Sequence, residues 1–193
     1  ASALASGSGD ADILTRVGLF DCWIGDLNAG LSAVQKAAVL DPLNPRVHRA
    51  LGLALIYAQK YDPSIAASRQ ALSLNQRIEG ANGAIGNALY LKGDFKGAMA
   101  AYLREPHISP RAAGLAIVAR RLGQNDQAEA ALNDLKAAPG LVTDYQQAEV
   151  LAQWGREDEA LAALARARKN GDSGLALMKV DPFLSPLRTA PAF

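Results

Sequence analysis

Three glycines separated by 34 residues constrain the fold of this chain more than any other feature of its sequence. Gly18, Gly52 and Gly86 each follow an apolar residue, and each is followed seven residues later by a turn. An apolar residue comes two positions after the start of each turn, and a small residue comes five positions after it. A repeat of this length, with small and apolar residues at fixed positions, is typical of a helical solenoid.

Short turns divide the chain into five predicted helix pairs. The turn position recurs at Gly25, Gln59, Gly93, Gly123 and Gly155, so the last two intervals are shorter than the first two. Between the turns, apolar residues recur with the period of a helix, and no sustained alternation predicts a strand. We predict helices at 11–24 and 27–40, 45–58 and 62–75, 79–91 and 95–104, 109–121 and 125–137, and 142–153 and 157–169.

These helices predict an all-α fold, a right-handed superhelix of five helix pairs. We divide the chain into a flexible linker over 1–10, repeats over 11–44, 45–78, 79–108, 109–140 and 141–174, and a C-terminal cap over 175–193. Ala98 and Ala128 occupy small-residue positions, so we expect both to be buried where two helices meet.

The C-terminal cap is predicted to be structural, because a terminal repeat has no neighbour on one side to bury its apolar face. Leu175, Leu177 and Met178 are expected to lie on the second helix of the last repeat, and a following Asp-Pro turn presents two more leucines. A frayed terminus is the alternative, because the prolines of this segment prevent a long helix.

The composition excludes several classes of function. The 20 basic and 19 acidic residues interleave and give a net charge of +1, so we predict no binding to nucleic acid or to an anionic membrane. No apolar run approaches the roughly 20 residues that span a bilayer. Cys22 is the single cysteine, which rules out a disulfide framework and favours a reducing, cytoplasmic location. The chain begins at Ala1 without an initiator methionine, so we expect a processed product or, in preference, a piece of a longer protein.

No cluster of residues predicts an active site. The stretch Gly171-Asp172-Ser173-Gly174 resembles the serine loop of chymotrypsin-like proteases, but those proteases are all-β, and a turn between helices is the better interpretation. His48 and His107 are the two histidines and have no companion ligands, and the acidic residues are scattered over helix faces. We therefore predict no catalytic residue, no metal and no cofactor.

The repeat positions resemble the tetratricopeptide-repeat consensus. The resemblance is carried by Leu51-Gly52, Leu55, Tyr61, Ser64, Ser68 and Ala71 in the second repeat, and by Ile85-Gly86, Leu89, Phe95, Ala98 and Tyr102 in the third. It covers about residues 11–174 and departs at the early aromatic position, which holds His48 and Asn82 in these two repeats.

A narrower resemblance links the chain to one bacterial group. It is carried by Leu40-Asp41-Pro42-Leu43-Asn44-Pro45, by Arg49-Ala50-Leu51-Gly52, by the stretch from Tyr145 to Val150 and by the tail from Val180 to Arg188. These segments resemble tetratricopeptide modules that follow class III adenylate cyclase domains or winged-helix DNA-binding domains. The resemblance implies the regulatory or docking part of a larger signalling protein. This part is itself no enzyme, although the full-length protein can carry a catalytic domain such as a nucleotide cyclase.

The tetratricopeptide resemblance also implies a concave face, lined by the first helix of each repeat, that binds a partner. The predicted partner-binding residues are Arg16, Trp23, Arg49, Leu53, Tyr57, Asn87, Tyr90, Ile117, Arg120, Arg121, Tyr145, Glu149 and Gln153. The clamp that binds chaperone tails is absent, because Leu53 and Ala84 replace its asparagines. Two functions stay open. One is an interaction module for a peptide, a partner protein or the chain's own effector domain, and the other is a structural scaffold that forms a homodimer.

Overall fold

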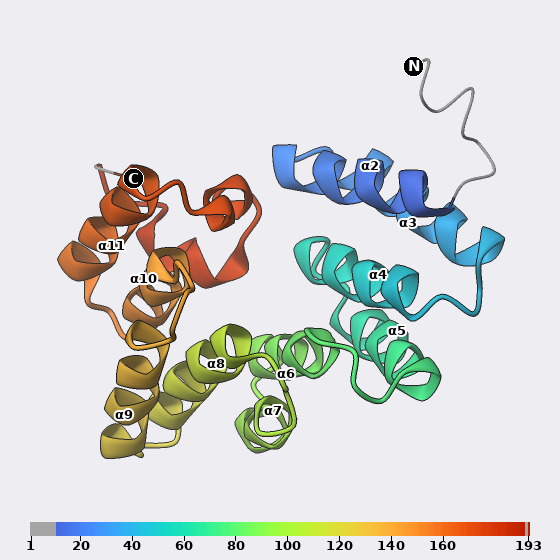
Figure 1. Cartoon of the computed structure of the whole chain (residues 1–193). Coiled ribbons are helices and arrows are strands. Elements are labelled where there is room, and N and C mark those ends of the chain that lie inside the picture. Colours follow the sequence, from blue (N-terminus) through green and yellow to red (C-terminus); the bar gives the residue numbers. More distant parts are fainter. Residues whose placement is uncertain (1–10, 192) are drawn as a thin grey trace.

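The computed structural model of the chain describes residues 11–191 and 193, so the predicted linker over 1–10 lies outside the described residues. Ten α-helices and two short 3-10 helices follow one another in this part of the chain (Figure 1). The pairs are α2 (Ala11–Ile24) with α3 (Leu27–Leu40), α4 (Pro45–Tyr57) with α5 (Tyr61–Leu74), α6 (Ala81–Leu91) with α7 (Phe95–Tyr102), α8 (Ile108–Arg121) with α9 (Asn125–Lys136), and α10 (Asp144–Gln153) with α11 (Glu157–Lys169). Their bounds lie within two residues of the predicted ones, which confirms the all-helical solenoid. Among the described residues, no helix is long and apolar enough to cross a membrane.

The helices begin and end at residues whose chemistry suits these positions. Asp26 and Asp94 cap α3 and α7, where their side chains accept hydrogen bonds from the backbone N–H groups of Ala29 and Gly97. Every predicted turn position has a positive φ: 97° at Gly25, 57° at Gln59, 85° at Gly93, 75° at Gly123 and 74° at Gly155. Glycine adopts this left-handed conformation without strain, whereas Gln59 carries a Cβ that makes it costly.

The glycines of the 34-residue period lie where the two helices of a repeat touch. A Cβ on Gly18 would come within 2.7 Å of a backbone oxygen of α3, and a Cβ on Gly52 within 2.3 Å of the Ser68 hydroxyl. In the third repeat, a Cβ on Gly86 would lie 2.5 Å from the ring of Tyr102. No side chain fits at these distances, so the period marks the points of closest helix approach.

The pairs stack into a curved solenoid with the first helix of each pair on its inner side (Figure 1). The inner helices α2, α4, α6, α8 and α10 contact one another in this order, and the second helices pack outside them. Ala98 of α7 and Ala128 of α9 are fully buried, as predicted. The largest apolar core runs from Tyr90 to Leu187, so the last three repeats and the C-terminal segment share one core.

The C-terminal segment folds back onto the inner side of the solenoid. The 3-10 helix η1 (Ser173–Leu177) contacts α11, as expected, and it also contacts α2 from the other end of the chain. The second one, η2 (Pro182–Leu187), lies on α10, the inner helix of the last repeat. Between them, the Lys179 ammonium donates a hydrogen bond of 2.8 Å to the Ile24 carbonyl oxygen of α2. The two ends of the solenoid therefore meet, and the segment covers part of the concave face (Figure 1).

Candidate functional site

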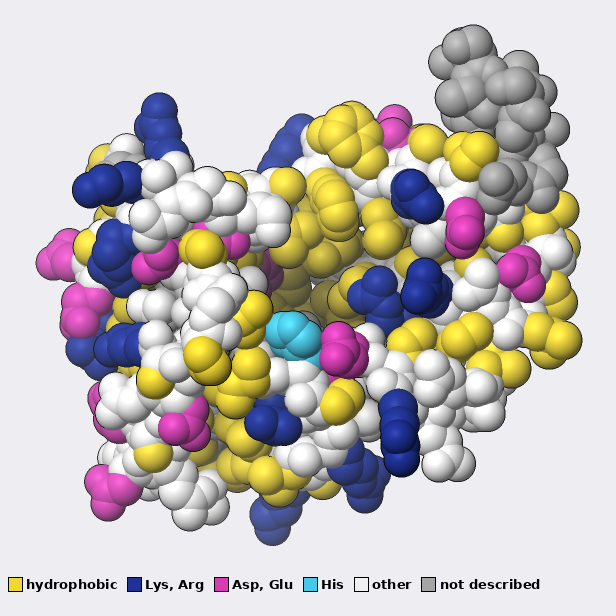
Figure 2. Space-filling model, in the orientation of Figure 1, with side chains coloured by type: hydrophobic (Ala, Val, Ile, Leu, Met, Phe, Trp, Pro, Cys, Tyr) yellow, Lys and Arg dark blue, Asp and Glu magenta, His cyan; other side chains and the backbone are white. Residues whose placement is uncertain are grey.

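The inner helices and the C-terminal segment enclose a cleft of about 280 Å³. All five inner helices contribute side chains to its wall, and the C-terminal segment closes one side. Six of the predicted partner-binding residues line the cleft: Trp23, Leu53, Tyr57, Asn87, Ile117 and Glu149. Figure 2 looks into the hollow of the solenoid, whose walls are mostly hydrophobic. An apolar, concave space with a few polar groups has the composition of a binding site.

Trp23 and Tyr57 form the aromatic wall that the first two repeats contribute. The Trp23 indole Nε1 is buried and has no hydrogen-bond partner of good geometry in the described part of the chain. Burial raises the pKa of the Tyr57 hydroxyl, and the nearby carboxyl groups of Asp181 and Glu149 raise it further. Tyr57 therefore stays neutral, and both rings present a hydrogen-bond donor beside apolar surface.

Glu149 of α10 and Asp181 of the C-terminal segment bring two carboxyl groups together beside the cleft. Asp181 is 3% exposed and accepts hydrogen bonds of 2.8 Å from the Tyr145 hydroxyl and from the Phe183 backbone N–H. Burial raises the pKa of Glu149 well above its ordinary value, and the charge of Asp181 and a hydrogen bond with it raise this pKa further. Glu149 therefore keeps its proton to a higher pH than an exposed glutamate does.

Three more predicted residues form a chain of hydrogen bonds that ends on the chain's own tail. Arg121 Nε donates a hydrogen bond of 3.0 Å to the Tyr90 hydroxyl, which in turn donates to Gln153 Oε1 at 2.9 Å. The Gln153 amide then donates to the Phe183 carbonyl oxygen at 2.7 Å. The rings of Tyr90 and Phe183 stack with their centres 5.6 Å apart. The structure thus gathers these side chains from three inner helices, and Phe183 lies where a partner was expected.

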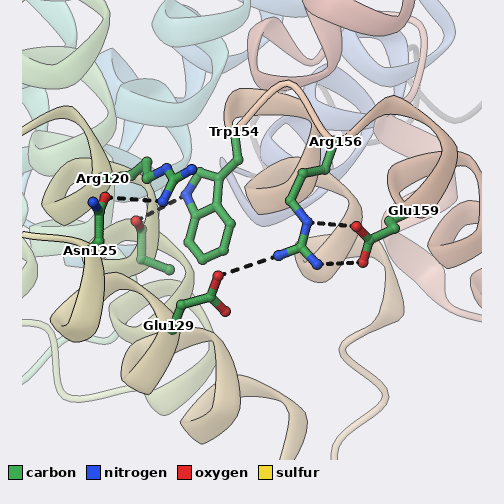
Figure 3. A network of polar contacts seen from close by, with 7 residues as sticks. Arg120, Asn125, Glu129, Trp154, Arg156 and Glu159 are labelled. Atoms are coloured by element: carbon green, nitrogen blue, oxygen red, sulfur yellow. Dashed lines mark hydrogen bonds and ion pairs between the residues drawn. The ribbon is translucent and has the colours of Figure 1, made fainter. Parts of the chain in front are cut away.

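Arg16 and Arg120 lie outside the lining of the cleft. Arg16 is exposed on α2. At the end of α8, Arg120 donates a hydrogen bond of 3.0 Å to Asn125 Oδ1, and its guanidinium lies 5.5 Å from the centre of the Trp154 ring. Arg156, which is ion-paired within its own repeat, approaches the same ring at 5.8 Å (Figure 3). This network joins the turns of the fourth and fifth repeats and stabilises the array.

Arg49 lines a second cavity of about 670 Å³ at the edge of the solenoid. Arg46 near the start of α4, Arg77 in the loop before α6 and His107 at the start of α8 line the same cavity. Pro110 lines both cavities, so they adjoin. Sequence reasoning missed the other three residues, because an exposed arginine or a lone histidine near a helix start is ordinary in any helical protein.

The tail residues of the cleft were also missed. Leu177, Asp181, Pro182 and Phe183 line it, although the segment was expected only to cap the last repeat. The Asp-Pro pair predicts a turn, but a turn alone does not show which side of α10 the following residues cover. That choice depends on contacts between distant repeats.

No protein-family model and no curated protein matches the sequence. Solved structures match over most of its length. A thermophilic tetratricopeptide-repeat protein of Thermus thermophilus is 22% identical and covers 92% of this chain and 98% of its own, with a TM-score of 0.69. The chain has the tetratricopeptide-repeat fold.

Two further structures share this tetratricopeptide-repeat fold. A tetratricopeptide-repeat protein of Parabacteroides merdae is 15% identical, with a TM-score of 0.70 over 96% of this chain and 73% of its own. PilF of Pseudomonas aeruginosa is 19% identical, with a TM-score of 0.61 over 88% of this chain and 83% of its own. Identities this low establish the fold and leave function to the residues of the site.

Proposed function

We propose that this tetratricopeptide-repeat chain is a non-catalytic protein-interaction module that binds an extended segment of a partner in its concave cleft. The observation that carries the proposal is the cleft of about 280 Å³ between the five inner helices and the tail. The apolar wall of the cleft can bury side chains of a bound segment. The polar groups of Trp23, Asn87 and Gln146 can form hydrogen bonds with the backbone of that segment. Because the tail covers the surface around Tyr90, the cleft is the accessible part of the concave face.

The proposal extends to the place of this module in a larger protein. The likeness of the segment from Leu40 to Pro45 and of the tail to modules of bacterial cyclase-like and winged-helix proteins supports a regulatory or docking role in signalling. The bound segment then belongs to a separate peptide, to a partner protein or to an effector domain of the same protein.

The test blocks the cleft at a residue whose side chain the fold does not need. Gln146 of α10 is half-buried in the cleft wall, and its side chain makes no hydrogen bond within the described residues. Gln146→Trp should fill the cleft, and Gln127→Trp on the exposed face of α9 is the matched control. Peptides selected on the full chain from a random display library should bind the control as well as the parent. They should bind Gln146→Trp at least about tenfold more weakly, a difference of about 1.4 kcal/mol.

Thermal melts of both variants establish that the added rings leave the fold intact. Equal peptide binding by the parent and by both variants would place the interface outside the cleft and contradict the proposal.

Exposed apolar residues of the first repeat favour a second candidate, a structural scaffold that forms a homodimer. Phe20, Ile24, Val39 and Leu43 are 57%, 50%, 79% and 74% exposed. Contact between two copies would remove such side chains from water. Sedimentation separates the candidates, since a dimer that Phe20→Lys dissociates supports the scaffold and a monomer supports the interaction module.

A further inference from the structure

Three arginines line the cavity at the edge of the solenoid. Arg46 and Arg49 lie near the start of α4, and Arg77 lies in the loop before α6. Within residues 11–191 and 193, no ion pair or hydrogen bond engages any of their guanidinium groups. A guanidinium presents donors in a planar fork that matches a carboxylate, so three such groups around one cavity form a surface that favours anions.

We call this cavity the arginine pocket and define it by Arg46, Arg49, Arg77, Glu79, Gly80 and His107. The lining of the pocket includes three arginines and one acidic residue, Glu79, whereas the whole chain carries a net charge of only +1. The positive charge is therefore local. Figure 2 shows a histidine and several basic side chains beside the central hollow of this face.

A buried carboxylate holds the backbone of the arginine pocket in place. Glu105 is 1% exposed and accepts hydrogen bonds from the backbone N–H groups of Gly80 at 2.9 Å, Gly83 at 2.8 Å and His107 at 3.0 Å. The N-terminus of α6 thus balances the charge of Glu105. His107 Nδ1 accepts a hydrogen bond of 3.3 Å from the Ser109 backbone N–H, so the neutral ring carries its proton on Nε2 as a further donor.

We propose that the arginine pocket binds the carboxylates of an acidic peptide segment whose apolar neighbours occupy the concave cleft. This inference rests on the proposed function, and Pro110, which lines both cavities, places the two next to each other. A lone phosphate would make no use of the adjoining apolar cleft, and the carboxylate of Glu79 opposes a densely charged anion. The partner is a protein segment in which apolar residues adjoin two or more acidic residues.

The test uses the full chain and a fluorescein-labelled synthetic peptide in which three leucines adjoin three glutamates. A control peptide has glutamine in place of each glutamate. Fluorescence polarisation should show saturable binding of the acidic peptide that is at least about tenfold tighter than that of the control peptide. This binding should weaken as salt is added, because exposed charges are screened.

Two double variants, each of which removes two positive charges, show where the acidic peptide binds. Arg46→Gln with Arg77→Gln changes exposed side chains that make no contact the fold needs, and it should weaken binding of the acidic peptide at least about tenfold. Arg69→Gln with Arg168→Gln removes the same charge from exposed helix surfaces elsewhere and should leave the affinity unchanged. Thermal melts of both double variants should match that of the parent.

Equal affinity for the two peptides, or equal losses in the two double variants, would overturn the inference. Pyrophosphate that binds more tightly than the acidic peptide would overturn it in favour of a phosphate site. If the selected peptides lose affinity for Gln146→Trp and yet bind the Arg46→Gln, Arg77→Gln double variant as tightly as the parent, that result would overturn the inference while the proposed function stands. Binding that needs these arginines but survives Gln146→Trp would instead contradict the proposed function and keep the arginine pocket as an anion site.

Discussion

The Glu149–Asp181 pair makes the stability of the folded chain depend on pH. In the unfolded chain Glu149 has its ordinary pKa of 4.5, whereas burial and the neighbouring Asp181 raise its pKa in the folded chain. Between these two pKa values the folded state holds a proton that the unfolded state has lost, so the free energy of unfolding falls as the pH rises. Glu149→Gln cannot ionise, and we expect it to flatten this fall and to be more stable than the parent at neutral pH.

Denaturant melts at several pH values between about 4 and 8 measure this effect. The exposed Glu157→Gln is the control and should keep the profile of the parent. If Glu149→Gln keeps that profile too, the pKa of Glu149 is not raised in the folded chain.

At the scale of the elements, the left-handed turn position of each repeat can be tested without changing any packing contact. No atom of the described residues lies within 4 Å of a Cβ built on Gly93, whose φ is 85°, so an alanine there changes the backbone preference alone. Gly93→Ala should lower the free energy of unfolding by about 1 kcal/mol. Gln59→Gly, at the same position of the previous repeat, should leave stability unchanged or raise it. Denaturant melts check both, and a Gly93→Ala variant as stable as the parent would contradict the conformation assigned to this turn.

The contact between the two helices of a repeat can be tested within one short helix. Ala98 of α7 is fully buried, whereas Ala100 of the same helix is exposed. Ala98→Leu should cost about 1–3 kcal/mol, because a well-packed contact has no space for three more carbon atoms. Ala100→Leu, which makes the same change of residue at the surface, should be nearly neutral. Denaturant melts that show equal stability for the two variants would remove Ala98 from the helix contact.

At the scale of the whole molecule, the sequence predicted the repeat array far better than the meeting of its two ends. The turns and the close helix contacts are local and recur every 34 residues in the first three repeats, so the helix pairs could be derived from them. The tail consists of two short 3-10 helices with no measurable period, and the hydrogen bond from Lys179 to Ile24 joins residues 155 positions apart. Tyr90 and Gln153 were assigned to the inner helices, but no local pattern shows that Phe183 covers them.

The C-terminal segment is an integral wall of the concave face, and a thermal melt of a chain that ends at Asp172 tests this most directly. Phe183, Leu184 and Leu187 are 4%, 0% and 1% exposed, and each such burial contributes on the order of 1.5–3 kcal/mol. Their loss also uncovers the apolar surface of α10. For a domain of this size, about 1 kcal/mol corresponds to roughly 2–4 °C, so we expect the melting temperature to fall by at least about 5 °C. A truncated chain that melts at the temperature of the parent would show that the segment is no part of the folded wall.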